Sequence, residues 1–193
     1  LTGAEAAQRV LSANGVRGVR IERVSGNLTD HFDPKTNVIR LSDSVHSSTS
    51  VAAIGVACHE AGHAVQYAQD YGPIKLRAAI IPATNIGSKL AMPLILAGIL
   101  FSFLGNLSYG LVYLGIACFS LSLVFQIVTL PVEFNASRRA IETIESSGIL
   151  TEEEQRGAKK TLTAAALTYV ASALSAVLQL LRLLLLFGGR RRD

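Results

Sequence analysis

The residues best suited to chemistry form one short segment, His59-Glu60-Ala61-Gly62-His63. Histidines four positions apart project from the same face of a helix, so their imidazoles can share one tetrahedral zinc ion at about 2.0–2.1 Å. Glu60 would point beside such an ion rather than at it, where a carboxylate can take a proton from a zinc-bound water. The spacing therefore predicts a water-activating zinc site with His59 and His63 as ligands and Glu60 as the general base.

The segment lies in an almost wholly apolar stretch, which predicts a buried helix over about residues 48–69. Two histidines and a carboxylate are costly to bury unless they share a ligand, and this favours a metal ion. The alternative interpretation is a pair of core histidines that are satisfied by a glutamate partner.

A third ligand is needed, because a catalytic zinc usually has three protein ligands and one open position. The metzincin pattern would place a glycine and a histidine three and six positions after His63, but glutamines stand there. Glu133 is the best candidate, since it is the only charged residue or histidine in the 48 positions from 90 to 137. A helix that starts at Pro131 would carry Glu133 in its first turn, facing the two histidines. A solvated carboxylate stabilised by the helix dipole is the alternative.

The same shortage of charge indicates a lipid bilayer. Of the 193 residues, 50% are apolar and 17% are charged, whereas roughly 25% are charged in an ordinary soluble domain. Apolar runs at 92–107 and 111–130 predict a membrane hairpin, with Pro131 closing its second helix, although at about 1.5 Å per residue the first run barely crosses about 30 Å. A hydrophobic hairpin inside a soluble bundle is the alternative, but the chain has too little amphipathic helix to wrap one.

The segments around these helices predict the rest of the fold. Thr2 and Glu5 have capping-box spacing, and residues 28–41 read as a β-hairpin with a central turn. The expected fold class is a mainly α integral membrane protein, a helical bundle with an HExxH zinc helix and a small β-hairpin element. Four regions are expected: an N-terminal helix, β-hairpin and HExxH helix over 1–91, a transmembrane hairpin over 92–130, a third-ligand helix and polar segment over 131–160, and a C-terminal apolar helix with a basic tail over 161–193.

Three segments together resemble one family. They are the zinc segment, residues 130–140 (Leu-Pro-Val-Glu-Phe-Asn-Ala-Ser-Arg-Arg-Ala) and residues 164–170 (Ala-Ala-Ala-Leu-Thr-Tyr-Val). They look like the YugP-type bacterial membrane zinc metallopeptidases, and residues 28–34 are similar to that family too. The likeness runs over nearly the whole chain and is far more specific than the zinc segment alone.

This resemblance implies an integral-membrane, gluzincin-like peptidase, distantly akin to HtpX and the CAAX prenyl proteases. It implies that His59, His63 and Glu133 hold one zinc ion per chain, that Glu60 is the base, and that proteins or peptides are the substrates. The family usually has a further membrane helix before the position of Leu1, so Leu1 is expected to be a boundary inside a longer chain.

Some roles around the metal stay open at this point. HtpX-like enzymes place an aspartate four residues after the third ligand to orient a zinc-bound histidine, but Ser137 stands there, and Asn135 is the alternative. The hairpin is either an edge strand for an extended substrate or a structural lid. A tetrahedral oxyanion needs another donor, for which the candidates are His31, Tyr67, Arg138 and Arg139.

Other functions fit the residues less well. FtsH-type proteases carry an ATPase with a GxxxxGK loop, which this sequence lacks, and site-2 proteases use an aspartate from a later membrane helix, where none occurs between Asp70 and Asp193. A membrane scaffold with a structural zinc would need a fourth protein ligand, and it is the remaining alternative. The sequence does not favour nucleic-acid binding, since the basic residues are scattered and no aromatic platform accompanies them.

The distribution of basic residues also predicts an orientation in the bacterial cell membrane. The loop at Asn106 has no lysine or arginine, whereas residues 131–160 have five, so the positive-inside rule places the active site on the cytoplasmic side. A spanning helix at 162–187 would leave the arginines at 190–192 outside, against the same rule. The sequence leaves the oligomeric state open.

Overall fold

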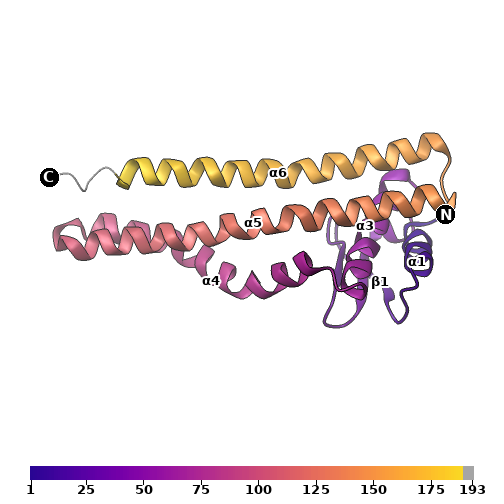
Figure 1. The fold of residues 1–193 in the computed structure, drawn as a ribbon, viewed down its shortest axis with the longest axis horizontal. Helices are drawn as coiled ribbons and strands as arrows, with labels where there is room; N and C mark the ends of the chain where they lie inside the picture. Colours follow the sequence, from indigo (N-terminus) through magenta and orange to yellow (C-terminus); the bar gives the residue numbers. More distant parts are fainter. Residues whose placement is uncertain (189–193) are drawn as a thin grey trace. The chain divides into compact units, whose positions relative to one another are not determined.

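The computed structural model describes residues 1–188, except for the side chain of Leu104. The chain is mainly helical with one small sheet, as the sequence predicts (Figure 1). It divides into two compact units, the first formed by Leu1–Lys75 and Pro131–Thr168 and the second by Leu76–Leu130 and the residues from Tyr169 onward. The predicted basic tail at 190–193 lies outside the described residues.

Three helices of the first unit lie in its N-terminal part: α1 (Gly3–Ala13), α2 (Asp43–His46) and α3 (Val51–Ala68). The predicted capping box opens α1, since the Thr2 hydroxyl accepts from the Glu5 backbone N–H at 3.3 Å and the Glu5 carboxylate accepts from the Thr2 N–H at 2.8 Å. The Ser50 hydroxyl caps α3 by accepting from the Ala53 N–H. The apolar faces of α1 and α3 pack together in one core.

The sheet has three strands, β1 (Arg20–Val24), β2 (His31–Asp33) and β3 (Val38–Ser42), in the order β1-β3-β2. The predicted hairpin is confirmed, because β2 and β3 pair antiparallel. β1 pairs parallel to β3, a contact that the local pattern did not predict. The row Ile21, Ile39 and Phe32 runs across the face that packs on the core.

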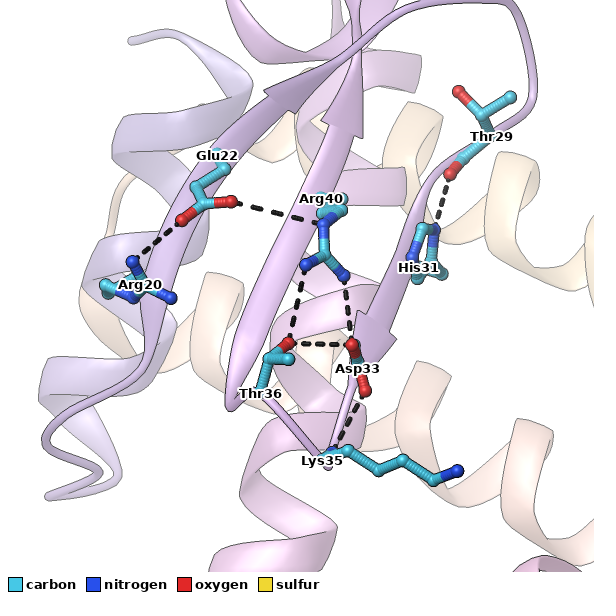
Figure 2. A network of polar contacts seen from close by, with 8 residues as sticks. All are labelled: Arg20, Glu22, Thr29, His31, Asp33, Lys35, Thr36 and Arg40. Carbon is cyan, nitrogen blue, oxygen red and sulfur yellow. Dashed lines mark hydrogen bonds and ion pairs between the residues drawn. The ribbon is translucent and has the colours of Figure 1, made fainter.

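The opposite face of the sheet is charged. Arg40 lies at its centre, 3.1 Å from the Asp33 carboxylate and 4.0 Å from that of Glu22, which also pairs with Arg20 at 3.0 Å. His31 lies on the same face, as Figure 2 shows. These contacts tie the three strands together on the side away from the core.

Three long helices complete the chain, α4 (Gly72–Leu100), α5 (Asn106–Ser147) and α6 (Glu152–Gly188), with a short 3₁₀ turn η1 (Ser102–Leu104) after α4. Each of the three is long and apolar enough to cross a membrane. The first span was predicted at 92–107, but its helix begins at Gly72 and ends at Leu100. Lysine and arginine mark the limit of a bilayer segment, yet they are good helix formers and do not end the helix itself.

The prediction that Pro131 ends one helix and starts another is wrong, because α5 passes through Pro131 without a break. Proline lacks an N–H and so leaves the carbonyl of Ile127 without its helical partner. The next turns compensate by packing, since Val132, Ala136 and Ala140 are fully buried. The packing of this face therefore outweighs the loss of one hydrogen bond.

Within the second unit, α4 and the first part of α5 approach each other closely. A Cβ on Gly98 would lie 2.8 Å from the carbonyl oxygen of Ser108, and one on Gly115 would lie 2.8 Å from that of Ala91. The Ser108 hydroxyl also donates to the Gly98 carbonyl at 2.5 Å. Small residues and serine bonds of this kind hold helices together in lipid.

Candidate metal centre

The site begins at the point where α3 touches α5. A Cβ on Gly62 would lie only 2.6 Å from the carbonyl oxygen of Ala136, so the two backbones approach as closely as glycine permits. His59 and His63 flank Gly62 on α3, while Glu133 lies three residues before Ala136 on α5. The contact therefore brings residues seventy positions apart in the sequence to one place.

Three donor side chains converge there. The ligand atoms of His59, His63 and Glu133 all lie within 4.8 Å of one another. The Glu133 Oε2 atom is 3.1 Å from Nε2 of His59 and 3.6 Å from Nε2 of His63. The side chains are 14%, 11% and 3% exposed, in the order His59, His63 and Glu133, so the carboxylate is the deepest of the three.

The spacing of these atoms fits a zinc ion. With bonds of about 2.0–2.2 Å and tetrahedral angles, two ligand atoms on one zinc lie about 3.3–3.6 Å apart. Of the two observed distances from Glu133 Oε2, 3.1 Å is slightly below that range and 3.6 Å is at its upper end. Two imidazoles and one carboxylate are also a donor set that catalytic zinc uses. The residues present could therefore hold the ion with small side-chain adjustments.

Each histidine has a partner on its other ring nitrogen. His59 Nδ1 is 3.0 Å from the Ser137 hydroxyl, and His63 Nδ1 is 2.9 Å from the Gln66 amide oxygen. An amide oxygen only accepts, so His63 donates from Nδ1, and in the neutral ring this leaves the Nε2 lone pair available to a metal ion. A hydroxyl can donate or accept, so Ser137 orients the His59 ring but sets its tautomer less firmly.

Gln66 is the centre of a buried polar network between the helices. Its side chain is fully buried, and its amide nitrogen donates to the Val132 carbonyl at 2.8 Å and to the Asn135 side-chain oxygen at 2.9 Å. The same Asn135 oxygen accepts from Nε of Arg139 at 2.7 Å. Gln66 was not among the predicted site residues. Its position three residues after His63, on the same helix face, is the signal that could have identified it.

The electrostatics of the cluster favour a cation. Burial alone would lower the pKa of His63, but the hydrogen bond to Glu133 and the nearby charge of Glu60 outweigh it, and the pKa is raised above its ordinary value. Glu60 is partly buried and follows His59 directly on α3. Two carboxylates beside two imidazoles thus attract positive charge, which a proton or a metal ion can supply.

His31 is not brought to the cluster. It lies on the charged face of the sheet, with its Nδ1 2.7 Å from the Thr29 carbonyl oxygen (Figure 2). The next residue, Phe32, points to the other face, where its ring contacts that of Tyr67 with centroids 5.6 Å apart. Because neighbours in a strand point in opposite directions, His31 is directed away from α3.

The other predicted donors lie on α3 and α5, the two helices that carry the cluster. Tyr67 follows His63 by one turn of α3, beneath β2. Arg138 is exposed, with Nε 3.8 Å from the Glu142 carboxylate. Arg139 is held by Asn135 and Gln69 and lies over the ring of Tyr71. Of these three, Arg139 is the one tied to the buried network through Asn135, which also bonds Gln66.

The family follows from a comparison over the whole described chain. A family model described as "Putative neutral zinc metallopeptidase" matches residues 1–188. The chain belongs to this zinc metallopeptidase family. It is also 49% identical over 192 residues to "Putative membrane protease YugP" of Bacillus subtilis (strain 168), an alignment that covers 100% of this chain and 83% of that protein. No solved structure matches. The resemblance noted in the sequence is thereby confirmed.

Proposed function

We propose that the protein is a membrane-embedded zinc metallopeptidase that hydrolyses peptide bonds, with His59, His63 and Glu133 as ligands and Glu60 as the general base. The observation that carries the proposal is the convergence of the three donor side chains on one point beside Glu60. Family membership and the membrane protease relative support the same activity. The three long apolar helices support a location in the membrane.

The reaction needs a polarised carbonyl, an activated water and a proton carrier. A zinc ion held here would polarise the scissile carbonyl and lower the pKa of its bound water to about 7. Glu60 takes a proton from the attacking water as the new C–O bond forms. It then passes that proton to the amine nitrogen as the C–N bond breaks, which restores the Glu60 carboxylate.

The number of ligands separates an enzyme from a scaffold. A structural zinc is closed by four protein ligands, whereas a catalytic zinc keeps one position open. Within residues 1–188, the cluster offers three donor side chains. This count supports a catalytic site over the scaffold alternative.

We also propose where the substrate lies and which side of the membrane the site faces. β2 is an edge strand, and Phe32 packs it over Tyr67 of α3, one turn from His63. An extended peptide can pair with such an edge by backbone hydrogen bonds. The positive-inside rule supports a cytoplasmic site.

The test combines metal analysis with two substitutions in the detergent-solubilised protein. Wild type should bind about one zinc per chain and degrade an unfolded protein. Glu60→Gln should keep the zinc and lose about 10²–10⁴-fold in rate, as expected for a general base. Glu133→Ala should lose zinc, while Glu153→Ala, an exposed glutamate on α6, should behave as wild type. Wild-type activity in Glu60→Gln, or no zinc in the wild type, would refute the proposal.

A further inference from the structure

A groove of about 330 Å³ lies between α5 and α6 in the first compact unit. Phe134, Ser137 and Ile141 line it from α5, and Leu162 and Ala166 line it from α6. The volume is at the lower end of the roughly 300–1,000 Å³ range of ligand pockets. The groove therefore suits one or two side chains rather than a whole folded partner.

One side chain joins this groove to the metal centre. The Ser137 hydroxyl that contacts His59 Nδ1 at 3.0 Å also lines the groove. Phe134 directly follows Glu133 and is 45% exposed at the groove wall. A peptide whose scissile bond lies over the three donors would therefore have a neighbouring side chain within reach of the groove.

The lining of the groove indicates what that side chain is. Its deepest residues are apolar, with Leu162 2% and Ala166 3% exposed. Two cations and two anions lie around its rim, so their formal charges cancel. A neutral rim over an apolar floor selects by apolar size rather than by charge. The rim residues are Arg138, Lys159, Glu142 and Glu145.

We propose that this groove is the specificity subsite that receives an apolar side chain, of leucine to phenylalanine size, from the substrate residue next to the scissile bond. The inference rests on the proposed peptidase function. Four charged groups around a short groove disfavour the alternative occupant, the acyl chain of a membrane lipid, because a long apolar chain would leave them desolvated.

Thr163 offers a way to fill the groove without touching the metal ligands. It is exposed on α6 and lines the groove. Ala165 is the matched control, since it is exposed on the same helix but lies two residues on, about 200° around the helix axis. Thr163→Leu and Thr163→Phe should fill the groove in two steps, and Ala165→Leu should leave it unchanged.

The assay compares two short fluorogenic peptides that differ only in leucine or alanine beside the cleaved bond. Wild type and Ala165→Leu should prefer the leucine peptide. Thr163→Phe should lower the leucine-to-alanine ratio of kcat/KM by about 10-fold or more, because a pocket contact of one methylene is worth about 10–200-fold. The leucine-to-alanine ratio of Thr163→Leu should lie between those of wild type and Thr163→Phe. Zinc content should be the same in all four proteins.

A binding measurement gives a readout that does not depend on turnover. In the Glu60→Gln background, the fluorescent leucine peptide should bind less tightly when Thr163→Phe is added, and equally tightly when Ala165→Leu is added. An unchanged ratio and unchanged binding in Thr163→Phe refute the subsite while wild-type cleavage keeps the peptidase. No cleavage of either peptide by wild type refutes the proposed function itself. Loss of a bound fluorescent fatty acid in Thr163→Phe, with peptide selectivity unchanged, would assign the groove to an acyl chain and overturn the subsite.

Discussion

The contact between Gly62 and the Ala136 carbonyl sets the distance between α3 and α5, and Gly62→Ala tests it. The new Cβ would lie 2.6 Å from the oxygen, and ordinary contacts begin at 3.4 Å, so the helices would have to separate by about 0.8 Å. Metal sites tolerate about ±0.2 Å in ligand distance. Glu133 would therefore move away from the two histidines by several times that tolerance.

The energy follows from the same contact. Overpacking of this kind costs about 1–3 kcal/mol, of which alanine returns up to about 1 kcal/mol in helix propensity. If zinc binding must pull α5 back against the full clash, the zinc affinity falls by about 5- to 150-fold. The zinc affinity is measured by competition with a chelator in detergent, and thermal unfolding is followed on the same samples.

Gly55→Ala is the matched control on the same helix. A Cβ on Gly55 would meet Ala158 and Leu162 at 3.8 Å, which is ordinary van der Waals contact. This variant should gain stability from helix propensity and keep its zinc affinity. Wild-type zinc affinity in Gly62→Ala would refute the argument that this contact positions Glu133.

Three further predictions follow from contacts described above. Gln66→Leu removes the acceptor for His63 Nδ1–H and should lower the zinc affinity about 10–100-fold. The zinc affinity is measured by the same chelator competition, and an unchanged value would exclude Gln66 as a positioning residue. The bonds from Thr36, Arg40 and the Lys35 N–H hold the pKa of Asp33 well below its ordinary value of 3.8. The stability that these bonds add is therefore present above pH 3.8 and is lost as the pH falls below it. The difference in chemical-denaturation midpoint between wild type and Asp33→Asn should shrink below pH 4, and a difference that stays constant would contradict this. Burial raises the pKa of the Cys58 thiol to about 12. At pH 8, maleimide labelling of Cys58, followed by mass spectrometry, should therefore require unfolding of the protein. Rapid labelling of the native protein would show that this part of α3 opens.

Much of the candidate site could be predicted because its spacing is local. His59 and His63 are one helical turn apart whatever the surrounding fold, and Glu133 stands out because it is the only charged residue or histidine from position 90 to 137. The meeting of α3 and α5 depends on packing, which is set by Gly62 and by the buried row around Ala136. We expected the two segments to meet because a catalytic zinc needs a third protein ligand; no sequence pattern indicated the helix contact itself.

The parts that could not be predicted depend on contacts across long stretches of chain. The position of Gln66 one turn after His63 could have drawn attention to it, but its bonds to the Val132 carbonyl and the Asn135 side chain have no signal in the sequence. The parallel pairing of β1 with β3 likewise has no local signal. At Pro131 the local rule gave the wrong result, because the burial of Val132, Ala136 and Ala140 compensates for the one hydrogen bond that proline removes.

The position of Pro131 has a consequence for how the chain meets changes in the bilayer. The boundary between the two compact units crosses α5 between Leu130 and Pro131, where proline leaves out one backbone hydrogen bond of the helix. Helices bend most readily at proline. We expect changes in lipid thickness or helix tilt to be absorbed at this joint, so that the carboxylate two residues beyond keeps its place beside the imidazoles.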